Sequence, residues 1–290
     1  MGLLHRLIRS TSPFWHRPLV DTEHGSKINI VTLNTWNCQG PFAQRLQLIA
    51  AGLEVLGADI ILLQEVFAEA STGLHVGEHL GNELGLHMSF APMREKTRER
   101  EGVPMLCYSG LAVLSRTAIL GSRIMRLPMD ERDGERVGQV VKIKMNGMCL
   151  EIGNVHLTHL DDADDLRREQ INLVTQGLDR TADLVILGGD MNAAQGHAIF
   201  QGLTGFNTPT FTDPAPLTTL NPINGQQPGS GPSIIDHIFV HAGGGRDLVA
   251  RARTALDAAD QNSGVYASDH MAVVVDVTLN RSHNKDCDVS

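Results

Sequence analysis

The sequence contains few cysteines, few aromatic residues and no long apolar runs, and each shortage excludes a class of protein. Its four cysteines, Cys38, Cys107, Cys149 and Cys287, are far apart and form no C-x-x-C pair. This excludes zinc-finger and thioredoxin-type sites and favours a reducing compartment. Aromatic residues make up 4% of the chain, which is little material for a base-stacking platform. No stretch approaches the ~18 consecutive apolar residues that a membrane-spanning helix requires.

Positive charge is also scarce, because the chain contains 24 Lys and Arg residues but 33 Asp and Glu residues, which gives a net charge of −9. That balance disfavours passive coating of nucleic acid, which depends on cations displacing counterions from phosphates. It does not exclude an enzyme that holds one phosphate through a metal ion. The 42% of hydrophobic residues excludes a disordered or fibrous chain. A chain of 290 residues can bury roughly three-quarters of its unfolded surface, so we expect a globular protein.

Hydrophobic periodicity predicts a strand–helix–strand opening over residues 28–33, 43–56 and 60–63. Residues 71–108 look irregular, and their dense run of mixed charges at 94–101 is typical of a solvated loop or hairpin tip and not of a binding stripe. Strands outnumber helices in the remainder, which favours a mixed-sheet α/β domain. The further elements that we predict are strands at 111–114, 137–145, 148–156, 184–187, 234–240 and 272–277, and a helix at 164–178.

We divide the chain into an N-terminal extension (1–26), a catalytic domain (27–280) and a C-terminal tail (281–290). The first 18 residues contain three arginines, no acid and a short apolar face formed by Leu3, Leu4, Leu7 and Ile8. One interpretation is a weak membrane-surface contact, and the other is a frayed or docked extension. We expect a cytoplasmic protein, at most peripheral at a membrane.

Polar residues that are costly to bury recur at the ends of the predicted strands. A strand end is a rigid mount at the rim of a sheet, where side chains can converge on a ligand. A single Asp in such a position is commonly a turn residue, but six positions of suitable chemistry indicate a site. They are Asn34, Gln64-Glu65, His156, Asp190-Met191-Asn192, Asp236 and Ser268-Asp269-His270.

The ordered motifs resemble those of the endonuclease/exonuclease/phosphatase superfamily, which includes deoxyribonuclease I, apurinic endonucleases, neutral sphingomyelinases, inositol-polyphosphate 5-phosphatases and deadenylases. The resemblance spans about residues 28–279. It implies a deoxyribonuclease I-like four-layer α/β sandwich, in which helices flank two mixed β-sheets, and metal-dependent phosphoester hydrolysis. The motifs are Thr32-Leu33-Asn34, Leu63-Gln64-Glu65, Gly110-Leu111-Ala112-Val113-Leu114-Ser115, Asn154-Val155-His156-Leu157, Gly189-Asp190-Met191-Asn192, Ile235-Asp236-His237 and Ser268-Asp269-His270.

The resemblance implies that Glu65 is the main metal ligand, with Asn34 and Asp269 beside it. Oxygen donors of this kind suit Mg²⁺ or Mn²⁺, which keep several waters and bind through one or two carboxylates. Asn37 competes with Asn34 for the first motif, although the preceding strand favours Asn34. Gln64 is a further candidate for the second layer of the site.

Five residues receive chemical roles from the same resemblance. Asp190 would orient or deprotonate the attacking water, and Asn192 would hydrogen-bond the phosphoryl oxygens. His270 would serve as a base or phosphate donor, with its imidazole oriented by Asp236. His156 would donate a hydrogen bond or proton near the scissile phosphate.

Other polar residues have less specific interpretations. Arg167, in the helix after His156, is a candidate to support the site from behind, as is Gln170. We interpret His159 and His237 as neighbours of the site. The acidic run 161–165 suggests a second metal site or, more simply, the first turn of a helix.

Departures from the superfamily's patterns narrow the branch. His156 stands where apurinic endonucleases place a tyrosine, and Ala193 and Ala194 interrupt the signature of the 5-phosphatases. Our first hypothesis is a nuclease-like phosphodiesterase, acting on nucleic acid, a phospholipid head group or a small phosphodiester. A sphingomyelinase or phospholipase C-like enzyme and a phosphoinositide phosphatase are alternatives. A non-catalytic binding module is less favoured, because every polar position of the site is filled.

Overall fold

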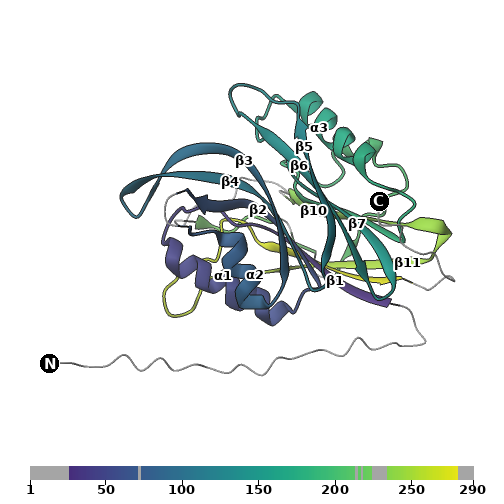
Figure 1. The fold of residues 1–290 in the computed structure, drawn as a ribbon, viewed down its shortest axis with the longest axis horizontal. Helices are drawn as coiled ribbons and strands as arrows, with labels where there is room; N and C mark the ends of the chain where they lie inside the picture. Colours follow the sequence, from purple (N-terminus) through teal and green to yellow (C-terminus); the bar gives the residue numbers. More distant parts are fainter. Residues whose placement is uncertain (1–25, 71–72, 213–214, 217, 224–233, 280–290) are drawn as a thin grey trace.

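Two mixed β-sheets face each other in the computed structural model, which describes residues 26–70, 73–212, 215–216, 218–223 and 234–279 (Figure 1). The apolar N-terminal segment interpreted above and the C-terminal tail lie outside these residues. The first sheet has seven strands and the second has five. This confirms the predicted α/β sandwich.

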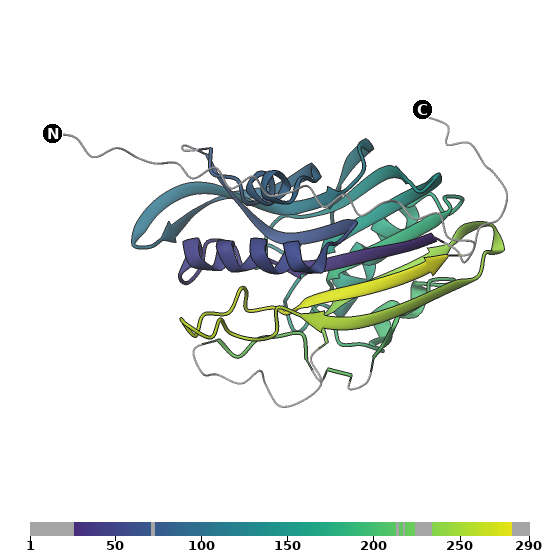
Figure 2. The same cartoon turned by 90° about the horizontal axis from the view of Figure 1, so that it is seen from below.

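The seven-stranded sheet contains the predicted opening strands at its centre. β1 pairs in parallel with β2 and antiparallel with β12, which brings the first and last parts of the described chain together (Figure 2). In spatial order the strands are β3 (His87–Arg100), β4 (Val103–Ser115), β2 (Ile60–Glu69), β1 (Ser26–Asn34), β12 (Ala272–Leu279), β11 (Leu248–Ala255) and β9 (Thr210–Phe211).

The five-stranded sheet supplies the second wall of the central core. Its parallel pair, β7 and β8, lies between antiparallel neighbours. In spatial order the strands are β10 (Asp236–Ala242), β8 (Leu184–Asp190), β7 (Met148–His156), β6 (Arg136–Met145) and β5 (Ile119–Leu127).

Helices cover the outer faces of both sheets, which gives four layers. α1 (Phe42–Leu56) and α2 (Val76–Leu84) pack on the seven-stranded sheet, whereas α3 (Asp164–Gly177) packs on the five-stranded sheet at the opposite side of the molecule (Figure 1). Leu46, Ile49 and Leu53 recur at helical spacing and form the buried face of α1. Short 3₁₀ helices occur at Ala198–Gly202 and Gly243–Gly245. Among the described residues, no helix is long and apolar enough to span a membrane.

Residues 73–108 differ from the predicted irregular segment, because they form α2, β3 and the start of β4. β3 and β4 extend as a long hairpin (Figure 1). The charged run 94–101 lies at the tip end of this hairpin, as one of its two interpretations predicted. The strand itself was not predicted, because its period of two is a pattern of charge and not of hydrophobicity. β5 and β11 were also not predicted.

Candidate active site

The register of the five-stranded sheet aligns three of the predicted residues. β7 and β8 are parallel and pair His156 with Asp190, while antiparallel β10 pairs Asp236 with Asp190. The three residues therefore form a row across neighbouring strands at one edge of the sheet. All three are buried. The expectation that strand ends bring these side chains together is borne out.

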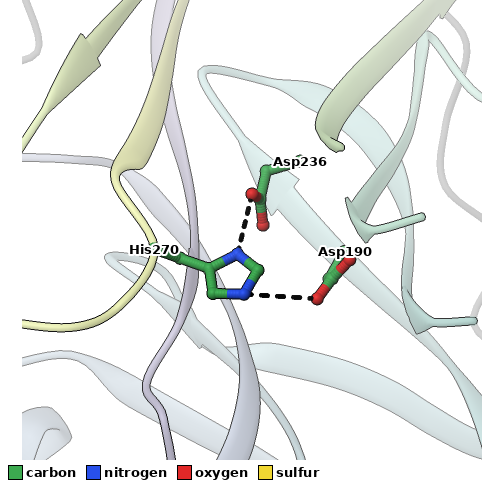
Figure 3. A group of neighbouring side chains, drawn as sticks. All are labelled: Asp190, Asp236 and His270. Carbon is green, nitrogen blue, oxygen red and sulfur yellow. Dashed lines mark hydrogen bonds and ion pairs between the residues drawn. The ribbon is translucent and has the colours of Figure 1, made fainter. Parts of the chain in front are cut away.

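His270 joins this row from the segment that precedes β12 in the other sheet. Its Nδ1–H donates to Asp236 Oδ2 at 2.9 Å (Figure 3). Thr219 Oγ1 donates to the same oxygen at 2.7 Å. Burial alone would lower the pKa of His270, but the charges of Asp236, Asp190 and Asp269 raise it to about 10. His270 is therefore a charged donor whose orientation Asp236 fixes.

Asp190 lies between two imidazoles. Its Oδ2 is 3.4 Å from His156 Nε2 and 3.8 Å from His270 Nε2, and it accepts a hydrogen bond from Asn34 Nδ2 at 3.1 Å. Burial and the charge of Asp236 raise the pKa of Asp190, against the opposing charge of His270. A carboxylate with raised basicity in a fixed position is suited to accept a proton.

His156 stays neutral at the edge of this group. Burial, followed by the charges of Arg136, His270 and His159, lowers the pKa of His156 well below its usual value. Its Nε2–H faces Asp190, while the buried Nδ1 has no hydrogen-bond partner among the described residues. A neutral imidazole in this position can donate a hydrogen bond without adding charge.

Asn192 closes the turn after β8 in a left-handed backbone conformation with φ of 46°. Its backbone N–H donates to Asp190 Oδ1 at 3.0 Å, and its side-chain amide donates to the carbonyl of Leu157 at 3.0 Å. Asn192 therefore joins the loops that follow β7 and β8 and lies next to the aspartate, while its contact with phosphoryl oxygens stays a prediction.

Glu65 lies on the opposite side of the site, at a bulge in β2. The register of β2 with β4 shifts between Leu63 and Val66, and Glu65 adopts φ of 52°. A bulge re-aims a side chain that regular pairing would place elsewhere. The carboxylate accepts a hydrogen bond from Asn37 Nδ2. The two asparagines of the first motif thus have different partners: Asn34 contacts Asp190 and Asn37 contacts Glu65.

Asp269 brings a second acid to the side of Glu65. It is half-buried, and burial together with the charge of Glu65 raises its pKa. Among the described residues, neither carboxylate forms an ion pair with a basic side chain. The charges of His270 and Arg45 act on Asp269 without forming an ion pair with it. Two neighbouring acids without an ion-pair partner fit a divalent metal ion, and their oxygen donors suit Mg²⁺ or Mn²⁺.

A second group of possible metal ligands is formed by Asp190, Asp236 and His270, whose donor atoms lie within 4.8 Å of one another. In this group the oxygen Asp236 Oδ2 already accepts hydrogen bonds from His270 Nδ1 and Thr219 Oγ1, and Asp190 Oδ2 accepts one from Asn34 Nδ2. We therefore favour Glu65 and Asp269, with Asn34 nearby, as the metal-binding residues.

Gln64 and Arg167 lie behind the site and touch none of the charged site residues. Gln64 Nε2 donates to Asn154 Oδ1 at 2.8 Å, a buried hydrogen bond that joins the two sheets. Arg167 donates to the carbonyls of Thr158 and Leu160, and therefore orders the loop after His156. Gln170 also binds this loop, through the backbone N–H of Thr158.

The remaining polar candidates lie beside the site. His159 contacts Asp133 at 3.0 Å, and His237 contacts the carbonyl of Ala193 at 2.9 Å. Asp164 and Asp165 occupy the first turn of α3, as the simpler interpretation of the acidic run predicted.

Sequence analysis missed a buried arginine that organises the metal side. Arg45 in α1 donates to the carbonyls of Thr35, Trp36, Asn37, Gln39 and Ala267. Burial lowers its pKa to about 10. An arginine in an amphipathic helix is usually a surface residue. The one indication in the sequence that Arg45 belongs to the site was its position in the first turns of the helix that follows the Asn34 motif.

Comparison with known proteins agrees with this geometry. The model of the endonuclease/exonuclease/phosphatase family matches residues 34–270. The chain belongs to this family. Its members are in general hydrolases that act on phosphoester bonds, typically with divalent metals. A search of curated proteins finds no match.

Solved structures share the fold at low sequence identity. An endonuclease/exonuclease/phosphatase from Beutenbergia cavernae DSM 12333 is 21% identical, with a TM-score of 0.68 over 87% of this chain and 72% of that chain. D. rerio TDP2, solved with a single-strand DNA product, is 16% identical, with a TM-score of 0.66 over 87% of this chain and 99% of that chain. A Bacteroides vulgatus member is 16% identical, with a TM-score of 0.65 over 88% and 99%.

Proposed function

We propose that this protein is a divalent-metal-dependent phosphodiesterase of the nuclease type. The observation that carries the proposal is the buried carboxylate of Asp190, held between His156 and His270 beside the acids Glu65 and Asp269. This arrangement brings together a base (Asp190), a charged hydrogen-bond donor (His270) and two acids that can bind a cation (Glu65 and Asp269). Hydrolysis of a phosphodiester requires all three, because the charged phosphate repels nucleophiles and the leaving oxygen takes up negative charge as its bond to phosphorus breaks.

In this proposal the residues of the chain divide the work. Asp190 orients a water molecule and accepts its proton. His270 donates a hydrogen bond through Nε2–H, because its 3.8 Å distance from Asp190 is too long to use that hydrogen. Asn192 and His156 donate to the phosphoryl or leaving oxygens. When bound by Glu65, Asp269 and Asn34, Mg²⁺ or Mn²⁺ supplies positive charge to the phosphoryl group.

Nucleic acid is the substrate class that we favour. The fold is shared with a TDP2 structure that contains a single-strand DNA product. The sphingomyelinase-like alternative drew its support from residues 1–18, which lie outside the described part of the chain. No described feature favours that alternative or the phosphoinositide phosphatase.

The test is a hydrolysis screen of the purified protein with Mg²⁺ or Mn²⁺, and with EDTA. Substrates are single-stranded and duplex DNA, RNA, sphingomyelin, phosphoinositides and bis-p-nitrophenyl phosphate. We expect metal-dependent cleavage of nucleic acid and of the small diester, which Asp190→Asn abolishes. Cleavage that persists in EDTA or in Asp190→Asn would disprove the mechanism, and cleavage of lipid alone would disprove the substrate class.

A further inference from the structure

β3 carries a row of cations that the site described above does not use. The half-buried cations are Arg94, Lys96 and Arg98. In contrast, Glu95, which lies between Arg94 and Lys96, and Glu99, which follows Arg98, are exposed. Alternate residues of a strand point to the same face. The mixed charges of this segment are therefore sorted by the strand into a positive inner face and a negative outer face. We call Arg94, Lys96 and Arg98 the β3 basic row.

One end of the β3 basic row lies against the loop that supports His156. The guanidinium of Arg94 packs directly on Gly134, so closely that a Cβ atom there would collide with it. Two residues further on, Arg136 Nη1 donates to the carbonyl of His156 at 3.4 Å. This end of the row is thus next to the Asp190 side of the site.

The other end lies against the loop that carries Asn37. Cys38 Sγ is 3.8 Å from the carbonyl of Glu99. In register, Lys96 faces Cys107 of β4, whose thiol is buried in the same cluster as Cys38. Because Asn37 binds Glu65, this end of the row is next to the metal side of the site.

In the described part of the protein, Asp133 and Glu135 act on the charge of the β3 basic row only at a distance. No ion pair joins Arg94, Lys96 or Arg98 to an acid there, and the buried Nε of Arg98 has no hydrogen-bond partner. Burial and then the charges of Arg94, Arg98 and Arg136 lower the pKa of Lys96. In contrast, the next cation, Arg100, pairs with Glu69 at 3.3 Å. Unpaired, partly desolvated cations favour an external anion.

We infer that the β3 basic row binds successive phosphates of a single nucleic-acid strand, beside the phosphate that is cleaved. Alternate strand residues are about 6.6 Å apart, so the row offers positive charge at regular steps, which matches a chain of phosphates and not one isolated group. Because the two ends of the row contact Gly134 and Cys38, in loops of the site, a strand held at the cleaved phosphate would continue along the row. The inference rests on the proposed function only for the position of the cleaved phosphate.

Binding is tested in EDTA, so that hydrolysis does not contribute, with a fluorescein-labelled single-stranded oligonucleotide at several salt concentrations. The variant is Lys96→Gln/Arg98→Gln. Its matched control is Lys27→Gln/Lys144→Gln, which removes the same charge from exposed positions near the start of β1 and the end of β6. We expect at least about a tenfold weaker Kd for the variant, and a salt slope smaller by about 1.4, from ~0.7 per lost phosphate contact. The control should remain close to wild type.

The charge-preserving variant Lys96→Arg/Arg98→Lys should retain binding. If Lys96→Gln/Arg98→Gln is too unstable to assay, the single variant Lys96→Gln should still lower the salt slope of binding by about 0.7. Equal effects in the variant and the matched control, or none in either, would overturn the inference. The inference would also be overturned if Lys96→Gln/Arg98→Gln lost binding to phosphatidylserine vesicles but kept its binding to the oligonucleotide. Hydrolysis of bis-p-nitrophenyl phosphate, measured separately, reports on the proposed function, because this substrate has a single phosphate.

Discussion

The two halves of the site are built differently. The buried half, Asp190, Asp236, His156 and His270, lies along a regular sheet edge and is closely interconnected. The open half, Glu65, Asp269 and Asn37, is formed at a bulge and a left-handed turn, and its acids have no basic ion-pair partner among the described residues. Proton transfer requires groups fixed in advance, whereas Mg²⁺ keeps several of its waters and requires room.

A buried arginine supports each half, and the two arginines have different kinds of partner. Arg136 supports the buried half and is paired with Asp133 at 2.6 Å. Arg45 supports the open half and has only backbone carbonyls as hydrogen-bond partners. The buried half is therefore held by an ion pair that can titrate, and the open half by hydrogen bonds to groups that cannot.

The largest effect is expected in the buried half. Asp190→Asn keeps the volume of the side chain but removes its basicity, and His270→Ala removes a positioned donor. General acid–base groups typically contribute ~10²–10⁴-fold in rate, so each change should lower kcat by at least about a hundredfold. Added Mg²⁺ should not restore the activity of Asp190→Asn, since its defect is not metal affinity. Thermal unfolding should remain cooperative in both variants.

The double variant distinguishes one joint action from two separate ones. If Asp190 and His270 serve the same transition state, their combined loss should be smaller than the product of the single losses. Strictly multiplicative losses would mean that the two residues act independently. Wild-type turnover in either single variant would mean that phosphate is handled elsewhere.

The second effect concerns the anchor of the open half. Arg45→Met keeps the apolar stem but leaves several buried carbonyls without a donor, so we expect the free energy of unfolding to fall by about 3 kcal/mol. Urea unfolding measures this loss. The matched control is Arg116→Met, which removes a more exposed arginine that pairs with Asp59 at 2.8 Å and should cost about 1 kcal/mol or less. Equal losses would refute the anchoring role.

The same contrast explains what the sequence could predict. The buried half follows from regular strands, whose apolar runs end directly before Asp190 and His156, so its residues could be located by counting along strands. The open half depends on a bulge at Glu65 and on positive φ at Asn37. Neither leaves a local pattern in the sequence: the end of the apolar run 60–63 located Glu65, but only the family resemblance indicated its role as a metal ligand.

The support of the site was harder still to predict. Arg45 and Thr219 act through contacts with residues distant in sequence, and no periodicity records such contacts. The strand β3 was not predicted for a related reason. Its alternating charges indicate a solvated loop or a hairpin tip, because no apolar period marks the strand, yet in the hairpin the strand places these charges on two faces.

The third effect tests the open half directly. Glu65→Gln removes one negative charge without changing the shape of the side chain, so the concentration of Mg²⁺ required for half-maximal activity should rise roughly ten- to a hundredfold, the range typical of perturbed metal sites. High Mg²⁺ should restore much of the activity, in contrast to Asp190→Asn. Activity titrations against Mg²⁺ for both variants measure the difference. An unchanged metal requirement in Glu65→Gln would place the metal at Asp190, Asp236 and their neighbours instead.

The smallest effect concerns acid and the ion pair beneath the buried half. Burial would raise the pKa of Asp133, but hydrogen bonds from Arg136 and Thr158 and the charge of Arg136 hold it below the ordinary value. A carboxylate whose pKa is lowered by folding stabilises the protein above its unfolded pKa of about 3.9, and this contribution is lost as the pH falls through the lower, folded value. The difference in unfolding free energy between wild type and Asp133→Asn should therefore narrow as the pH is lowered from 7 to below 4. The corresponding difference for Arg45→Met should change less over that range, because the hydrogen-bond partners of Arg45 are carbonyls and the acids Asp269 and Glu65 act on it only through their charge at a distance. Urea unfolding of the three proteins at each pH measures both differences, and a parallel narrowing would show that the two halves are not anchored in different ways.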